Sequence, residues 1–213
     1  MIRNIATVMR GTIFAQGIGF LALPLLTRLF EPTAFGHYQL FISLLTVLLV
    51  LPTLRYEVAL LRAGDDEEYS ALASLCLVLC FTVTLATCAV LSIFWAIGWP
   101  EQIAKLPFAP WVLMLAMLVG GVGQFVTIIG TREKAFGAIA NSKMLQSAAY
   151  VTAGLLIGYA FSSDLGLVAA DIVGRIALLL FLGWWAVRNL PQLFGRLSFA
   201  AMRATAHRYR EYP

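Results

Sequence analysis

The sequence predicts an all-α integral membrane protein with six transmembrane helices, and three observations indicate this class. Six long apolar segments fill the 213 residues, and each has about the 20 residues that a helix needs to cross about 30 Å of hydrocarbon. Only 12% of the residues are charged, roughly half the share found in a soluble domain. The alternating pattern of a membrane barrel is absent, and a backbone in lipid must satisfy its own hydrogen bonds, which favours helices.

The six predicted spans follow one another with short loops between them. Their approximate ranges are 11–30, 37–56, 71–97, 110–130, 142–161 and 165–187. Pro24 and Pro52 lie inside the first two spans, where the missing N–H and the ring predict kinks. The acidic run at 65–68 precedes the third span, where carboxylates favour a helix N-terminus. Residues 188–213 are too polar to span, and they predict a basic helix at the inner leaflet or a linker.

The basic residues lie almost entirely on one side of these spans. With the N-terminus inside, eleven lysines and arginines fall on the cytoplasmic side, and only Arg28 and Lys105 fall outside. The positive-inside rule therefore predicts that both termini of this chain are cytoplasmic. Because the positive charge acts as a topology signal, the net charge of +4 does not indicate a nucleic-acid partner.

Motifs of soluble catalysis are absent from the sequence. There is no glycine loop of the form GxxxxGK[ST], no HExxH and no GxSxG. His37 and His207 lie on opposite predicted sides, and Cys76, Cys80 and Cys88 share one predicted helix as small packing residues. We therefore predict that the protein is not an enzyme and has no catalytic residues, no metal site and no cofactor.

Charged side chains inside apolar segments are the first candidates for a substrate or ion pathway, because charge at the middle of a bilayer costs several kcal/mol. Asp171 and Arg175 are four residues apart with the acid first, the favourable order for an ion pair within a helix. Arg175 lies about ten residues, roughly 15 Å, into the sixth span. Two interpretations remain open: the pair lines a water-filled cavity, or it is a purely structural ion pair between helices.

Three more charged residues lie near the ends of spans. Arg55 and Glu57 are two residues apart and cannot pair on one helix face. Arg55 is either a gate or substrate contact, or a boundary residue that snorkels to the interface. Arg28 ends the first span and is either a cavity contact or a helix cap, since a cation suits a helix C-terminus.

Neutral polar residues also recur on single faces of two spans. These faces are Thr12, Gln16, Gly19, Leu23 and Thr27 in the first span, and Gly120, Gln124, Thr127 and Thr131 in the fourth. Such a face either lines a polar route or makes contacts between helices, and the second is the commoner role. The candidate substrate-contacting or cavity-lining residues are therefore Gln16, Arg28, Arg55, Glu57, Gln124, Asp171 and Arg175.

Several stretches of the chain match the motifs of a known family in order and spacing. Residues 26–38 (LTRLFEPTAFGHY) and residues 54–60 (LRYEVAL) resemble the first outer loop and the inner end of helix two of polysaccharide-repeat-unit flippases. These flippases belong to the multidrug/oligosaccharidyl-lipid/polysaccharide exporter superfamily. Residues 136–146 resemble the start of helix five, 166–174 helix six, and 208–213 the cytoplasmic segment before helix seven. Their order and spacing carry the resemblance more than any single motif does.

The resemblance implies two six-helix lobes around a central cavity with alternating access. The substrate implied is a lipid-pyrophosphate-linked oligosaccharide, carried to the outer leaflet of the bacterial inner membrane for surface polysaccharide such as the lipopolysaccharide O-antigen. Cavity arginines would face the pyrophosphate. Residues 1–187 would then form the N-terminal lobe, with membrane lipids and a second lobe or second chain as partners. The alternatives are an ion-coupled drug exporter of the same superfamily and a non-transporting membrane scaffold.

Overall fold

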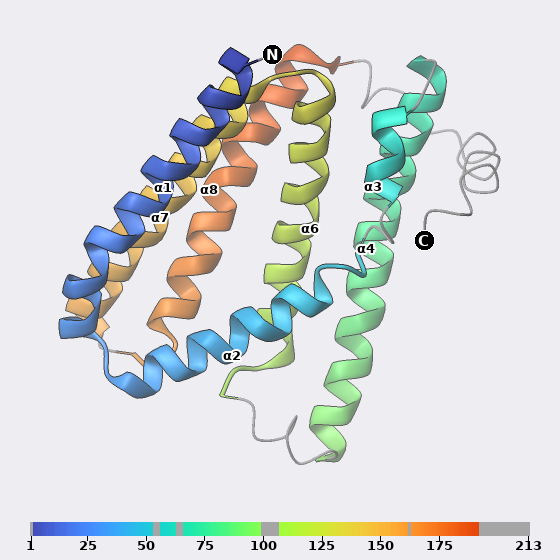
Figure 1. Cartoon of the computed structure of the whole chain (residues 1–213). Helices are drawn as coiled ribbons and strands as arrows, with labels where there is room; N and C mark the ends of the chain where they lie inside the picture. Colours follow the sequence, from blue (N-terminus) through green and yellow to red (C-terminus); the bar gives the residue numbers. More distant parts are fainter. Residues whose placement is uncertain (1, 53–55, 63–65, 99–106, 162, 192–213) are drawn as a thin grey trace.

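The computed structural model describes residues 2–52, 56–62, 66–98, 107–161 and 163–191, and every regular element in them is a helix (Figure 1). The long helices are α1 (Ile2–Leu29), α4 (Asp66–Ile97), α6 (Pro110–Arg132), α7 (Phe136–Phe161) and α8 (Gly166–Asn189). The shorter ones are α2 (Pro32–Leu48), α3 (Tyr56–Ala59) and the 3-10 helix η1 (Leu60–Arg62). The predicted all-α membrane class is confirmed.

Five of the six predicted spans correspond to long helices that are apolar enough to cross a membrane. Most of these helices extend beyond their apolar segments. The predicted range 142–161 lies within α7, which begins at Phe136, and α4 begins at Asp66, inside the acidic run that was expected to start it. The predicted basic helix or linker at 188–213 lies mostly outside the described residues, because α8 ends at Asn189.

The prediction of one continuous helix over 37–56 is wrong. Helix α2 has 17 residues, which gives a length of about 25 Å and leaves it short of the hydrocarbon thickness. After Leu48 the chain tightens into a turn, in which the Leu51 N–H donates to the Leu48 carbonyl at 3.0 Å. Pro52 ends the helix instead of kinking it, because it has no N–H and its ring disfavours helical geometry at the preceding residue. In contrast, α1 continues through Pro24.

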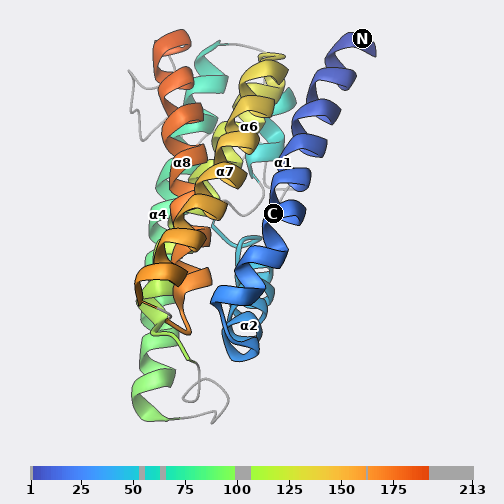
Figure 2. The ribbon, with the colours of Figure 1, turned by 90° about the vertical axis from the view of Figure 1, so that its left-hand side faces the viewer.

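Helices α2 and α3 together cross the bundle as a broken pair. In Figure 1, α2 runs obliquely across the long helices, and α3 resumes beside α4 beyond the break. Figure 2 shows α2 on one side of the layer that α4, α6 and α8 form. The start of α1 and the end of α8 lie at the same end of the bundle (Figure 1). The chain therefore has this broken pair of helices where the sequence predicted one continuous second span.

Helix packing gives the layer the order α1, α7, α8, α6 and α4. Phe41 and Leu45 of α2 are fully buried against this layer, and Phe41 meets Phe108 edge to face, with ring centroids 5.5 Å apart. The break after α2 packs on α6 at Gly121, where a Cβ atom would lie 3.0 Å from Cβ of Pro52. Small residues thus allow the broken segment to approach α6 closely.

Arg132 joins η1 and α4 to the end of α6. Its guanidinium donates a hydrogen bond to the carbonyl of Leu60 and lies over the ring of Tyr69, 3.8 Å from the centroid. A cation over an aromatic face is attracted by the ring quadrupole. This contact holds the segment after the break against α6.

The close approach of α1 to α7 gives a test of the packing. A Cβ atom on Gly11 would lie 2.5 Å from Cβ and 2.8 Å from Cα of Ala140, whereas one on Gly17 would meet nothing within 4 Å. We expect Gly11→Ala to lower the free energy of unfolding by about 1–3 kcal/mol through overpacking. Gly17→Ala is the control and is expected to be neutral or stabilising, because alanine is the better helix former. Equal melting temperatures of the two variants in detergent would contradict this packing.

Candidate functional site: two adjoining polar cavities

A polar cavity of about 460 Å³ lies between α3, α6, α7 and α8, and we name it the charged cavity. Its polar lining consists of Glu57, Gln124, Thr127, Lys143, Gln146 and Arg175. Gly120 and Gly123 of α6 also line it. Because glycine has no side chain, α6 leaves room for the cavity at these two positions. A cavity of this size falls in the range of ligand-binding pockets.

A second cavity of about 370 Å³ lies between α1, α2, α7 and α8, and we name it the aromatic cavity. Its lining consists of Thr12, Ala15, Gln16, Tyr38, Lys143, Gln146, Ser147, Tyr150 and Asp171. The Ser147 hydroxyl donates to the carbonyl of Ala15 at 2.6 Å, which fixes α7 against α1 at the edge of the cavity. The remaining polar side chains of the lining are amides, hydroxyls and charged groups.

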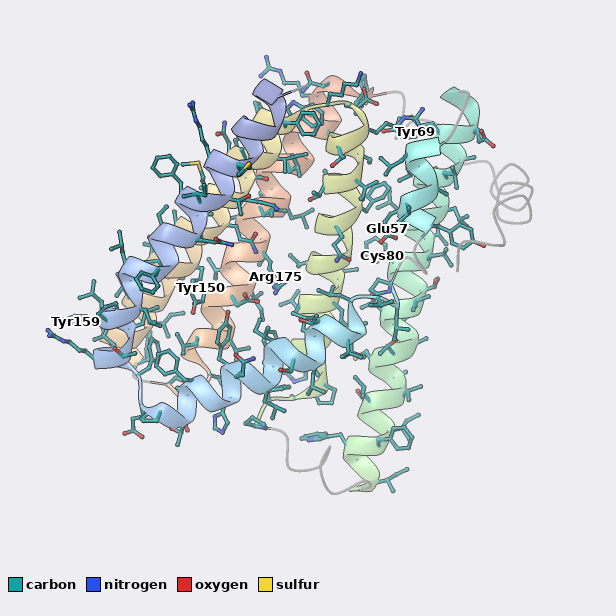
Figure 3. All side chains as sticks on the ribbon, in the orientation of Figure 1. Glu57, Tyr69, Cys80, Tyr150, Tyr159 and Arg175 are labelled. Carbon is teal, nitrogen blue, oxygen red and sulfur yellow. The ribbon has the colours of Figure 1, made fainter. Side chains whose placement is uncertain are left out.

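The two cavities adjoin each other at α7 and α8. Lys143 and Gln146 line both cavities. The Asp171–Arg175 ion pair connects them as well, because Asp171 lines the aromatic cavity and Arg175 the charged cavity. Figure 3 shows Tyr150, Arg175 and Glu57 one after another across the middle of the bundle. The result is a two-part polar site between helices that are otherwise apolar.

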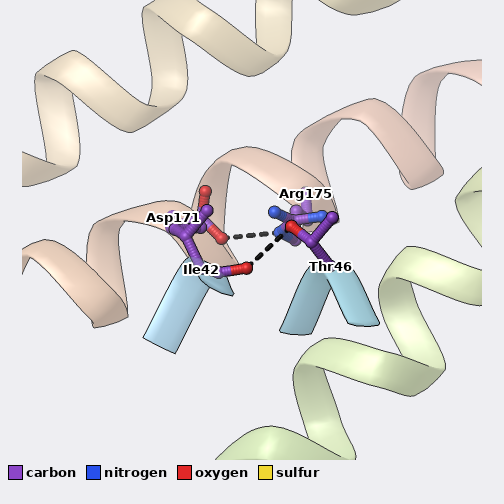
Figure 4. A network of polar contacts seen from close by, with 4 residues as sticks. All are labelled: Ile42, Thr46, Asp171 and Arg175. Carbon is purple, nitrogen blue, oxygen red and sulfur yellow. Dashed lines mark hydrogen bonds and ion pairs between the residues drawn. The ribbon is translucent and has the colours of Figure 1, made fainter. Parts of the chain in front are cut away.

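The predicted pair of Asp171 and Arg175 is present in the structure. Arg175 Nε donates to Asp171 Oδ2 at 2.6 Å, and Asp171 is only 8% exposed. Figure 4 shows the pair beside the turn of α2 that carries Ile42 and Thr46, whose hydroxyl donates to the Ile42 carbonyl at 2.7 Å. Thr46 therefore uses its hydroxyl proton within α2.

The Arg175 guanidinium still has donors for a ligand. Within the described ranges, its one hydrogen bond uses Nε, and Nη1 lies 3.5 Å from the place that a Cβ on Gly120 would occupy. Because a guanidinium carries five N–H donors, most of them remain for an anion in the charged cavity. Lys143 adds a second cation to this lining and Glu57 adds a carboxylate, while the Asp171 carboxylate lines the aromatic cavity.

The predicted site residues are only partly brought together. Gln16 and Asp171 line the aromatic cavity, while Glu57, Gln124 and Arg175 line the charged cavity. Arg28 is exposed at the C-terminal end of α1 and lines neither of these two cavities. Arg55 lies outside the described residues. The functional role of all seven residues stays a prediction.

Sequence reasoning missed Lys143, Tyr38 and Tyr150 as lining residues. In the sequence, Lys143 is one of the eleven basic residues that indicate the orientation, and both tyrosines lie within predicted apolar segments. A signal was present in α7, because Lys143, Gln146, Ser147 and Tyr150 follow the spacing of one helix face. Among the described residues, no group of three or more His, Cys, Asp or Glu side chains could hold a metal ion.

Comparison with known proteins places these features in a wider context. The sequence profile of a family described as "Polysaccharide biosynthesis protein" matches residues 1–209, a range that includes both cavities. Neither the curated proteins nor the solved structures give a significant match to the chain.

Proposed function

Because the chain belongs to the polysaccharide biosynthesis family, a family of membrane transporters, we propose that it translocates a lipid-pyrophosphate-linked oligosaccharide. The lipid-linked repeat unit would move from the inner to the outer leaflet of the bacterial inner membrane, where it enters surface polysaccharide. The step breaks no covalent bond, so the protein acts as a flippase and not as an enzyme.

The observation that carries this proposal is a pair of cations inside the bundle. Lys143 and Arg175 both line the charged cavity. Ammonium and guanidinium groups form short, strong hydrogen bonds with phosphate oxygens. Glu57 and Asp171 offset part of the positive charge, which suits a transporter because the ligand must bind well enough to enter and weakly enough to leave.

We also propose that a second lobe faces the two cavities. Gln16 and Gln124 are exposed although they line the cavities, so one lobe does not enclose a head group. Polar groups left open to lipid are costly, and transporter sites typically lie between repeats near discontinuous helices. The break between α2 and α3 is a discontinuity of this kind. We name the chain together with its second lobe the complete transporter.

The proposed orientation places both ends of this chain in the cytoplasm and is tested by cysteine labelling. Ile103→Cys is expected to be blocked by an impermeant thiol reagent added to whole cells, because position 103 lies in a predicted outer loop. Asp66→Cys is expected to resist the reagent. The native cysteines are first replaced by alanine at positions 76, 80 and 88. The reverse labelling pattern would contradict the orientation.

Transport itself is tested by complementation. In a bacterium that lacks its own repeat-unit flippase, the complete transporter is expected to restore surface polysaccharide. The competing function is drug export, which Glu57 and Asp171 favour, because carboxylates inside the membrane suit cationic drugs and coupling ions. A drug exporter would raise resistance to cationic dyes and leave surface polysaccharide absent. That outcome would replace the proposed function.

A further inference from the structure

Two tyrosines that stack on each other give the aromatic cavity a surface of ring carbons. Tyr38 of α2 and Tyr150 of α7 stack with ring centroids 6.0 Å apart and an angle of 24° between the planes. Both side chains line the cavity. Cations recognise pyrophosphate without an aromatic surface. The two rings are therefore available to contact another part of the ligand.

Neutral side chains that form hydrogen bonds surround the rings, together with the charged groups of Lys143 and Asp171. Thr12 and Gln16 of α1 and Gln146 of α7 line the same cavity. Each amide offers both donors and an acceptor, and a hydroxyl offers both as well. A sugar ring has the matching pattern, with an apolar C–H face and a rim of hydroxyl groups. Its C–H face carries partial positive charge and is attracted by the negative face of an aromatic ring.

We propose that the aromatic cavity is a carbohydrate subsite, in which Tyr38 and Tyr150 stack against a sugar ring while the charged cavity binds the attached pyrophosphate. This inference rests on the proposed function and deepens it. A sugar bonded directly to pyrophosphate requires two subsites that touch, and Lys143 and Gln146 line both cavities. The bound head group therefore has a direction, with its sugar toward α1 and α2 and its phosphates toward α3 and α6.

The test compares lipid pyrophosphates with and without a sugar. The probes are geranylgeranyl pyrophosphate and three derivatives that carry glucose, N-acetylglucosamine or rhamnose on the pyrophosphate. The complete transporter is placed in lipid nanodiscs and the dissociation constants are measured by calorimetry. At least one sugar is expected to tighten binding roughly threefold to tenfold, the range that an aromatic contact supplies.

Variants of the two tyrosines are expected to remove this gain alone. Tyr38→Leu and Tyr150→Leu should abolish the tightening by the sugar and leave the affinity for the bare pyrophosphate unchanged. Tyr38→Phe and Tyr150→Phe keep the rings and should keep most of the gain. Lys143→Gln should weaken every probe by about tenfold, the loss of one charge-assisted contact, and preserve the difference between probes. Tyr159→Leu is the matched control, because Tyr159 lies on the same helix and is 87% exposed.

Each result supports or overturns the subsite. If none of the three sugars tightens binding, or if the leucine variants keep the gain, the carbohydrate subsite is refuted while the proposed function stands. If the bare pyrophosphate fails to bind, the proposed function is refuted instead. Should a leucine variant fail to fold in a thermal melt, a methionine at the same position, which removes the ring and fills a similar volume, is interpreted in the same way.

Discussion

Arg175→Leu is expected to abolish polysaccharide export by the complete transporter and to lower its free energy of unfolding by about 3–5 kcal/mol, the cost of leaving one partner of a buried ion pair uncompensated. Asp171 is 8% exposed and bonds to Arg175 Nε at 2.6 Å. Removal of the guanidinium therefore leaves the Asp171 carboxylate buried between helices without its cationic partner. Surface polysaccharide and thermal unfolding in detergent measure the two effects.

A double variant separates the two open roles of this pair. Asp171→Leu combined with Arg175→Leu is expected to recover most of the stability, because two apolar side chains of similar volume replace a buried ion pair at little or no cost. Export should nevertheless stay at background, because the charged cavity has lost its guanidinium. Asp164→Leu, which removes an exposed carboxylate before α8, is the control. Export by the double variant at the normal level would show that the pair is only structural.

The second large effect concerns the lobe by itself. Residues 1–213 alone are expected to give no glycan export in a flippase-deleted bacterium, and addition of a second lobe is expected to restore it. A flippase must hide a large polar head group while it opens to each side in turn, and this rocking requires two repeats. The purified species is sized in detergent to exclude dimers. Full export by a strictly monomeric 213-residue chain would contradict the two-lobe account.

The sequence predicts the long helices well because each one has a single dominant signal. The ranges 110–130 and 165–187 nearly coincide with α6 (Pro110–Arg132) and α8 (Gly166–Asn189). The second span fails because hydrophobicity continues through Leu51 and Pro52 while helical geometry does not. Whether a proline kinks or ends a helix depends on packing, and here the break after α2 packs on Gly121 of α6. Hydropathy contains no information about that contact.

Part of the site is predictable from local spacing in the sequence, and part depends on contacts between residues far apart in the chain. Asp171 and Arg175 are predictable because the i, i+4 spacing alone brings them together. The stacking of Tyr38 on Tyr150 joins residues that are far apart in the chain, and only the packing of α2 and α7 around α8 creates it. Lys143 was hidden for a different reason. The positive-inside rule alone already explains a lysine near the start of a span, so the rule gives no indication of the face that Lys143 shares with Gln146 and Tyr150.

The central claim, that this chain carries lipid-linked glycan across the membrane, is tested most directly by the leaflet in which that glycan resides. Spheroplasts that lack surface polymerisation are treated with an impermeant glycosidase, with and without the complete transporter. With the transporter, we predict that the lipid-linked glycan is cleaved in intact spheroplasts. Without it, cleavage should require permeabilisation. Equal cleavage in intact spheroplasts with and without the transporter would contradict the account.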